Sequence, residues 1–72
     1  MAERDKINRI KLVLAEKEIS QKALAEKLSL TQNSVFRICK NEAQPSLRLL
    51  KKIALILDVD IKDLLHSTKP KA

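Results

Sequence analysis

The stretch from Ser20 to Lys40 constrains the fold of this chain more than any other part. It predicts two short helices, at residues 21–28 and 32–40, joined by a tight turn. Ser20 and Thr31 precede these helices, and each hydroxyl can cap the free N–H groups of a first helical turn. Apolar residues recur at helical spacing, and the expected inward positions are Leu24, Ala25, Leu28, Val35, Ile38 and Cys39. Each helix therefore packs by one face and leaves the other face outward.

The outward face of the second helix carries side chains that can read DNA bases. Gln32 and Asn33 fall in its first turn, and such amides can bond adenine at both N6 and N7. Arg37 follows one turn later, where it either forks onto a guanine or binds a phosphate. Phe36, the only aromatic residue, either touches a thymine methyl group or packs at the edge of the core. The pattern predicts a helix-turn-helix whose second helix enters the major groove, about 12 Å wide.

A second set of polar residues around this helix predicts contacts with the DNA backbone. Gln21 begins the first helix of the pair, where the free N–H groups and the helix dipole favour an anion. The other candidates are Thr31, Ser34, Lys40 and Asn41. Such contacts fix the register of a protein on DNA without reading its sequence. A solvated helix start for Gln21 and a simple cap for Thr31 stay open as alternatives.

Three further helices are expected to supply the rest of the core. They run from about Arg4 to Lys17, from Leu47 to Leu57 and from about Ile61 to His66. Ser46 can cap the fourth helix, and Asp60 with Asp63 has the spacing of a capping pair for the fifth. The inward residues of the first and fourth helices are predicted to be Ile7, Ile10, Val13, Leu14, Leu47, Leu50, Ile53, Ala54 and Leu57. The fold class is all-α, a compact five-helix bundle at residues 1–66 followed by a flexible basic tail at 67–72.

Composition favours a nucleic-acid partner. The formal net charge is +6, which attracts polyanions, although a merely soluble basic domain remains an alternative. The longest apolar run, Ile53–Leu57, is too short to span a bilayer, and residues 1–6 lack the apolar segment of a secretory signal. A single cysteine allows no intrachain disulfide, which is consistent with a cytoplasmic protein.

The motif resembles that of the Cro/repressor-like (XRE-type) DNA-binding family, whose fold is lambda-repressor-like. The matching residues are Ser20, Gln21, Leu24, Ala25, Leu30, Thr31, Ser34, Val35, Ile38, Pro45, Ser46, Leu47, Leu50, Ile53, Ala54, Leu57, Val59, Leu64 and Leu65. The resemblance covers about Ile10 to Leu65. It implies base contacts from the positions of Gln32 and Asn33 and a phosphate contact from Gln21.

The chain departs from the family pattern in two ways. Family glycines are replaced by Ser29, Asn41 and Asp58, of which Asn and Asp best tolerate a left-handed backbone. An Arg–Glu pair that often lies beneath the family's recognition helix is replaced by Leu14 and Cys39. We expect these two side chains to lie close together in one buried cluster, an apolar contact in place of an ion pair. Cys39 is then a packed core residue, and a redox-sensing thiol is the alternative.

No residue pattern indicates catalysis. His66 is the sole histidine, and the chain has neither a Cys/His metal cluster nor a glycine-rich phosphate loop. We therefore expect no enzymatic activity, cofactor, small-molecule ligand or membrane association. The function predicted is sequence-specific binding of double-stranded DNA by a prokaryotic or phage transcriptional regulator. The alternatives are an antitoxin that also binds a toxin, and a protein-interaction module on the same fold.

Surplus apolar residues late in the chain predict a homodimer. They fall outside the main inward stripe of the fourth helix or lie in the fifth, and they are Leu49, Leu55, Ile56, Ile61 and Leu65. A patch there can pair two domains and leave both recognition helices free, which would double a small DNA contact. The alternative is that these residues complete the core of the monomer.

Overall fold

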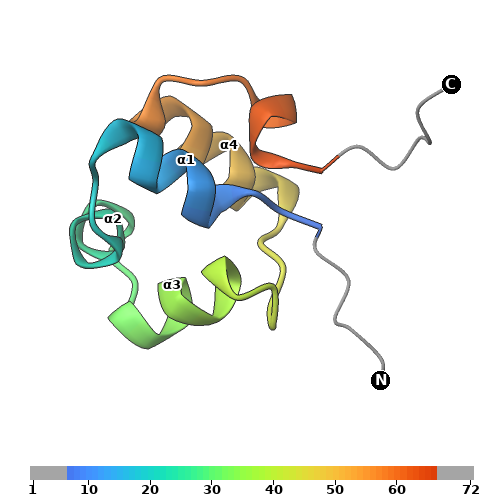
Figure 1. The fold of residues 1–72 in the computed structure, drawn as a ribbon. Helices are drawn as coiled ribbons and strands as arrows, with labels where there is room; N and C mark the ends of the chain where they lie inside the picture. Colours follow the sequence, from blue (N-terminus) through green and yellow to red (C-terminus); the bar gives the residue numbers. More distant parts are fainter. Residues whose placement is uncertain (1–6, 67–72) are drawn as a thin grey trace, which may run out of the picture.

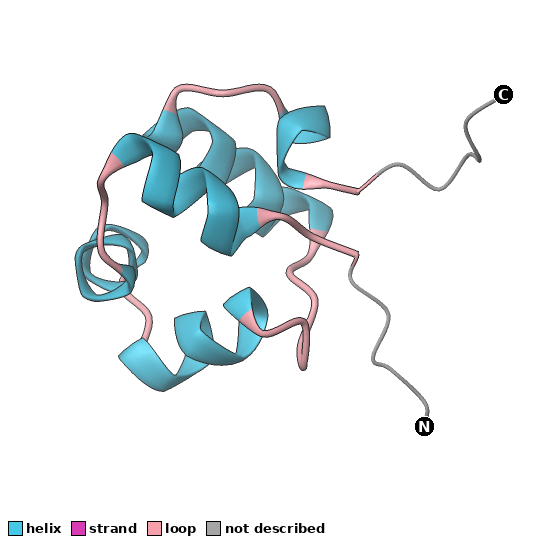
Figure 2. Ribbon diagram, viewed as in Figure 1, coloured by secondary structure: helices cyan, strands magenta, loops and turns pink. Residues whose placement is uncertain are grey.

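The computed structural model describes residues 7–66, and this part of the chain consists of helices and loops (Figures 1 and 2). The elements are α1 (Ile10–Lys17), α2 (Gln21–Leu28), α3 (Gln32–Cys39), α4 (Leu47–Leu57) and a short 3₁₀ helix, η1 (Ile61–Leu64). The all-α prediction is confirmed, but the fifth helix is a single 3₁₀ turn rather than an α-helix reaching His66. The predicted tail at 67–72 lies outside the described residues.

Local signals set the starts of α2, α3 and α4. Each helix is preceded by a hydroxyl that accepts a hydrogen bond from the N–H group three residues later. The hydroxyl and N–H pairs are Ser20 with Ala23 at 3.0 Å, Thr31 with Ser34 at 3.1 Å and Ser46 with Leu49 at 3.1 Å. These three predicted caps are confirmed, and each typically contributes about 1 kcal/mol. The predicted Asp60–Asp63 capping box at the start of η1 is also confirmed.

Tight reversals end the helices without any glycine. Ser29, Asn41 and Asp58, which stand where family members have glycine, all adopt the left-handed conformation with φ of 58°, 61° and 58°. Glu18 at the end of α1 does the same with φ of 57°, which the sequence did not predict. In this conformation the N–H groups that follow each helix can turn back onto its last carbonyl groups, so short loops suffice.

One apolar core lies between the four α-helices and η1. Its buried members are Ile10, Val13, Leu14, Leu24, Ala25, Val35, Ile38, Cys39, Leu50, Ile53, Ala54, Leu57 and Leu64. Leu14 and Cys39 both belong to it, so their predicted burial in one cluster is confirmed. The predicted inward positions of Ile7 and Leu47 are wrong, because these side chains are 49% and 77% exposed. Ile7 precedes the helix, and Leu47 is the first residue of α4, one turn before its buried stripe begins.

The described segment before α1, residues 7–9, is not helical. The first helix was expected from Arg4, whereas α1 begins at Ile10, and residues 4–6 lie outside the described range. Asn8 instead pairs with Leu65 in an isolated antiparallel bridge. The Arg9 N–H group donates to the Leu64 carbonyl at 2.7 Å, and the His66 N–H group donates to the Ile7 carbonyl at 2.8 Å. The two ends of the described chain are therefore hydrogen-bonded side by side (Figure 1).

Candidate nucleic-acid interface

The helices α2 and α3 pack against each other and form one side of the domain (Figure 1). The turn between them is closed by the Leu30 N–H group, which donates to the Ala25 carbonyl at 2.9 Å. Leu24 of α2 and Val35 of α3 are both almost completely buried. Since their inward faces are fixed in this way, the opposite face of α3 is left toward solvent.

Four predicted DNA-contacting residues meet on this outward side. Gln21 of α2 joins Gln32, Asn33 and Phe36 of α3 around an open hollow of about 300 Å³. Gln32 and Asn33 are exposed, and their amide groups make no hydrogen bond to any residue in the range 7–66. The geometry therefore brings two free amides of α3 next to the start of α2.

The exposure of the Phe36 side chain does not decide between the two interpretations from the sequence, which are contact with DNA and packing at the edge of the core. Its side chain is 47% exposed, so the ring is neither in the core nor fully in solvent. The Lys40 ammonium nitrogen sits 4.9 Å from the ring centroid, within the range of a cation–π contact. One face of the ring is thus associated with a cation, and contact with a thymine methyl group stays a prediction.

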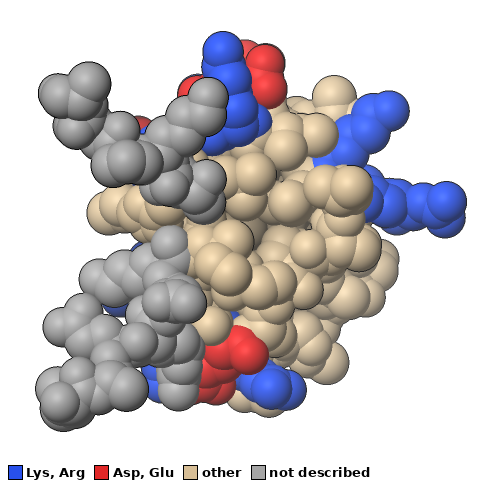
Figure 3. Space-filling model, turned by 90° about the vertical axis from the view of Figure 1, so that its right-hand side faces the viewer, with Lys and Arg blue, Asp and Glu red and all other residues tan. Residues whose placement is uncertain are grey.

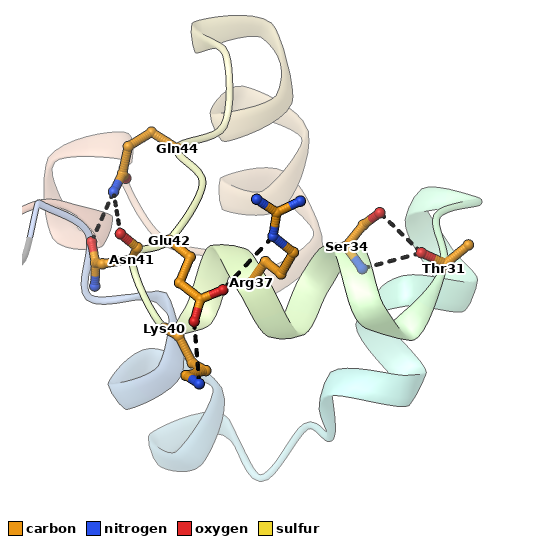
Figure 4. Close-up of polar contacts among 7 residues, drawn as sticks. All are labelled: Thr31, Ser34, Arg37, Lys40, Asn41, Glu42 and Gln44. Atoms are coloured by element: carbon orange, nitrogen blue, oxygen red, sulfur yellow. Dashed lines mark hydrogen bonds and ion pairs between the residues drawn. The ribbon is translucent and has the colours of Figure 1, made fainter.

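Arg37 and Lys40 share one carboxylate at the end of α3 (Figure 4). The Arg37 Nε lies 3.8 Å from Glu42 Oε1, and the Lys40 Nζ lies 3.2 Å from Glu42 Oε2. The Arg37 and Lys40 side chains remain 54% and 46% exposed. The sequence analysis singled out both cations but missed Glu42. The signal in the sequence that could have indicated Glu42 is its position, because it lies in the loop directly after a helix end that carries two cations.

Thr31 and Ser34 bond to each other at the start of α3. The Thr31 hydroxyl accepts from the Ser34 N–H group at 3.1 Å and donates to the Ser34 hydroxyl at 2.9 Å. Capping is therefore an established role of Thr31. The contact of these two hydroxyls with a phosphate stays a prediction.

The Asn41 side chain is engaged inside the domain. Its Oδ1 accepts from the N–H groups of Ile7 and Asn8, both at 2.9 Å, and from the Gln44 amide at 3.1 Å. Its Nδ2 donates to the Asn8 carbonyl at 3.2 Å. The Asn41 amide ties the end of α3 to the segment before α1, and its predicted contact with a phosphate stays a prediction.

Asn8 completes this polar cluster from the other side. It is only 3% exposed, and its Nδ2 donates to the Ile38 carbonyl at 2.9 Å and to Gln44 Oε1 at 3.0 Å. Its Oδ1 accepts from the Ile10 N–H group at 3.1 Å, a local bond typical of a helix start. Sequence reasoning missed Asn8 because it placed the residue inside a helix. An Asn two residues before an apolar helical stripe was the signal for a later start.

Neither a metal-ligand cluster nor a membrane-spanning helix occurs within residues 7–66. No group of three or more His, Cys, Asp or Glu side chains among residues 7–66 could hold a metal ion. None of the helices in that range is long and apolar enough to cross a membrane. Burial raises the pKa of the Cys39 thiol, and the positive charge of Lys11 offsets part of this rise.

Comparison with known proteins gives three findings. The helix-turn-helix family model matches residues 10–64. A crystal structure described as that of a "putative DNA-binding protein" from Bacteroides fragilis is 45% identical in sequence, with a TM-score of 0.82, and the match covers 83% of this chain and 97% of that one. No curated protein matches the chain.

Proposed function

Because the chain belongs to the helix-turn-helix family, we propose that it binds double-stranded DNA sequence-specifically and acts as a prokaryotic or phage transcriptional regulator in the cytoplasm. One observation carries the proposal: the exposed amides of Gln32 and Asn33 meet Gln21 around one hollow, and no described residue bonds to them. The similar structure from Bacteroides fragilis carries the description "putative DNA-binding protein", and this supports the choice of DNA as the ligand.

In the proposed complex, α3 lies in the major groove and α2 crosses the DNA backbone. Gln32 and Asn33 bond adenine edges, and Arg37 forks onto a guanine. Phe36 contacts a thymine methyl group beside them. The start of α2 places Gln21 at a phosphate, where the helix dipole favours a negative charge. Lys40 and the hydroxyls of Thr31 and Ser34 add phosphate contacts. The residues that contact phosphates thus position the domain, and the residues that contact bases read the sequence.

The regulatory role follows from occupancy of the site. A domain of this size carries no described element beyond those that build and hold the helix-turn-helix. We therefore propose that the bound protein acts by blocking or recruiting the transcription machinery at its site.

Selection of bound duplexes from a random pool tests the proposed function. We expect enrichment of one short motif with adenines and a guanine at the positions facing α3. Affinity for this motif should exceed affinity for random duplex at the same salt concentration by about 10³-fold or more. A wild-type protein without measurable affinity for any duplex at low salt would instead favour the protein-interaction module.

We further propose a two-fold homodimer through α4 and η1. Leu49, Ile56, Ile61 and Leu65 are only partly buried against the core, and Leu55 is 73% exposed. The side of the domain where η1 and the start of α4 lie carries few charged side chains outside the grey residues, and most of its charges sit at the margins (Figure 3). Apolar side chains that the core leaves partly exposed suit self-association, and the half-sites would lie about one helical turn apart.

Sedimentation of the protein at micromolar concentration tests the dimer. We expect a dimer for the wild type and a monomer for Ile56→Lys, because a lysine would bury a charge in the interface. Leu12→Lys is the matched control, since Leu12 is 53% exposed on α1, outside the proposed interface. A wild type that is monomeric both free and on its selected DNA would refute the dimer, and Ile56 would then only complete the core of the monomer.

A further inference from the structure

We propose that Glu42 determines how strongly this domain prefers its specific site over random DNA. It does so by orienting Arg37 toward base edges and by holding Lys40 in an ion pair that must open before Lys40 contacts a phosphate. The inference rests on the proposed function and deepens it, because it assigns a role to a residue that makes no proposed contact with DNA. Three observations carry it: the position of the Glu42 backbone, the atom of Arg37 that Glu42 meets, and the surroundings of the Lys40 ammonium group.

The Glu42 backbone is fixed by the turn that ends α3. Its N–H group donates to the Arg37 carbonyl at 2.9 Å, and the preceding residue, Asn41, has a left-handed φ of 61°. The Asn41 side chain is bonded to the segment before α1 at 2.9 Å. The Glu42 carboxylate therefore projects from a turn whose backbone is fixed by hydrogen bonds, and the Glu42 side chain is only 29% exposed.

Glu42 meets the guanidinium group of Arg37 at one particular nitrogen. Its Oε1 lies 3.8 Å from Nε, whereas the two terminal nitrogens of Arg37 point away from the carboxylate (Figure 4). A guanidinium group has a rigid planar fork, so a contact at Nε leaves the terminal pair available for the O6 and N7 atoms of a guanine. The carboxylate thus restricts Arg37 without occupying the nitrogens that would read a base.

Lys40 is held by two contacts at once. Its ammonium nitrogen lies 3.2 Å from Glu42 Oε2 and 4.9 Å from the centroid of the Phe36 ring. A lysine without such contacts is a flexible point charge that suits any phosphate it can reach. The ion pair between Lys40 and Glu42 must open before the Lys40 ammonium group can pair with a phosphate. The negative charge of the Glu42 carboxylate also repels phosphates directly.

The consequence differs between the two kinds of DNA. Binding to random duplex depends on neutralised phosphates, so a carboxylate that competes for two cations weakens it. On the specific site, Arg37 is bonded to a guanine by its terminal nitrogens and can keep its Nε contact with Glu42. The carboxylate therefore lowers random binding more than specific binding. Exposed ion pairs add little to folding stability, so the effect falls on DNA binding rather than on the fold.

The test uses Glu42→Gln, which keeps the size of the side chain and removes its charge. Affinities for the selected duplex and for random duplex are measured over a range of salt concentrations. We expect affinity for random duplex to rise about threefold to tenfold, with a salt slope steeper by about one released counterion. We expect affinity for the selected duplex to rise less or to fall, so the ratio of the two affinities decreases.

Glu16→Gln is the matched control, because Glu16 is an exposed acid on α1 and its loss changes the net charge by the same amount. It should change both affinities by one common factor. In the free protein, the Nε–H signal of Arg37 in a nitrogen-15 NMR spectrum should exchange faster with water in Glu42→Gln and remain unchanged in Glu16→Gln. This readout requires no DNA.

The outcomes separate this inference from the proposed function. If the wild type selects a specific motif but Glu42→Gln changes both affinities by the same factor as Glu16→Gln, Glu42 has no role in specificity and the DNA-binding function stands. A wild type that binds no duplex overturns both. A lower affinity ratio together with faster exchange at Arg37 supports the role of Glu42.

Discussion

The two ends of α3 are held in very different ways. At its start, the amides of Gln32 and Asn33 are exposed and bond to no residue in the described range. At its end, Asn41 and Gln44 form a hydrogen-bonded cluster with Asn8, which belongs to the segment before α1. The difference shows how a short helix can be anchored to the domain at one end and still leave polar side chains available to a partner at the other.

The anchored end also explains why residues 7–9 are not part of a helix. A helix running back from Ile10 through Asn8 would use the Asn8 N–H group and side chain differently, and the cluster with Asn41 would be lost. Outside the helix, the successive N–H groups of Ile7 and Asn8 both donate to Asn41 Oδ1, at 2.9 Å each. The hydrogen bonds that anchor the end of α3 therefore form in place of further helical turns at the start of α1.

The largest effect is expected from breaking the anchor with Asn41→Ala. The change removes four hydrogen bonds of the side chain, leaves the Asn8 N–H group without its partner and puts alanine in a left-handed conformation. We expect the free energy of unfolding to fall by about 2–4 kcal/mol. Urea denaturation measures it, with an unchanged dependence on urea if the fold is kept.

Asn41→Gly separates the two causes. Glycine accepts the left-handed backbone but still lacks the side-chain bonds, so its loss of stability should be smaller than that of alanine. If both variants are as stable as the wild type, the cluster does not anchor α3.

Sequence reasoning predicted the free end of α3 well and the anchored end poorly, and the reason is the range of the contacts. The caps at Ser20, Thr31 and Ser46 and the apolar stripes are local signals within three or four residues, so α2, α3 and α4 were placed almost to the residue. The anchor joins Asn8 to Asn41, which are 33 residues apart. A single sequence contains no local sign of such a pairing.

The start of α1 and the form of η1 were misjudged for the same reason. Apolar spacing extends back to Ile7 and onward to Leu65, and spacing alone continues both helices. Pairing of Asn8 with Leu65 ends them, because the backbone groups of both segments are used between the chain ends instead of within a helix. The hollow around Gln21 and Gln32 was foreseeable only in part, since the amide face was visible in the sequence but the approach of α2 was not.

The second prediction tests the free end. Replacing Gln32 or Asn33 by alanine should weaken binding to the selected duplex by about 1–3 kcal/mol and relax preference at one or two bases. Stability should change by less than about 0.5 kcal/mol, because neither side chain bonds within the described domain. Titrations on selected and random duplex measure the loss.

Gln21→Ala is the control for this pair, because it should weaken binding to all duplexes more evenly. Equal losses on specific and random DNA from all three variants would contradict the division between reading and positioning residues.

A smaller effect is expected from Thr31, whose hydroxyl caps the free end of α3. Thr31→Ala removes the acceptor of the Ser34 N–H bond and should lower the unfolding free energy by about 1 kcal/mol. Thr31→Ser should restore most of it, since serine keeps the hydroxyl. If alanine and serine have the same stability but differ in DNA affinity, Thr31 acts on phosphate and its cap is unimportant.

The smallest effect concerns Cys39, the last residue of α3, and tests how well the anchored end excludes water. Burial raises the pKa of its thiol above the ordinary value, so the folded state keeps the proton to higher pH than the unfolded chain does. Stability from this residue is therefore complete below the unfolded pKa, about 8.5, and is lost as the pH rises toward the folded pKa. As the pH rises above the unfolded pKa, the unfolding free energy of the wild type should fall more than that of Cys39→Ala, and urea denaturation at a series of pH values measures the difference. Equal losses in the two proteins would mean that water reaches the thiol and that the anchored end of α3 opens readily.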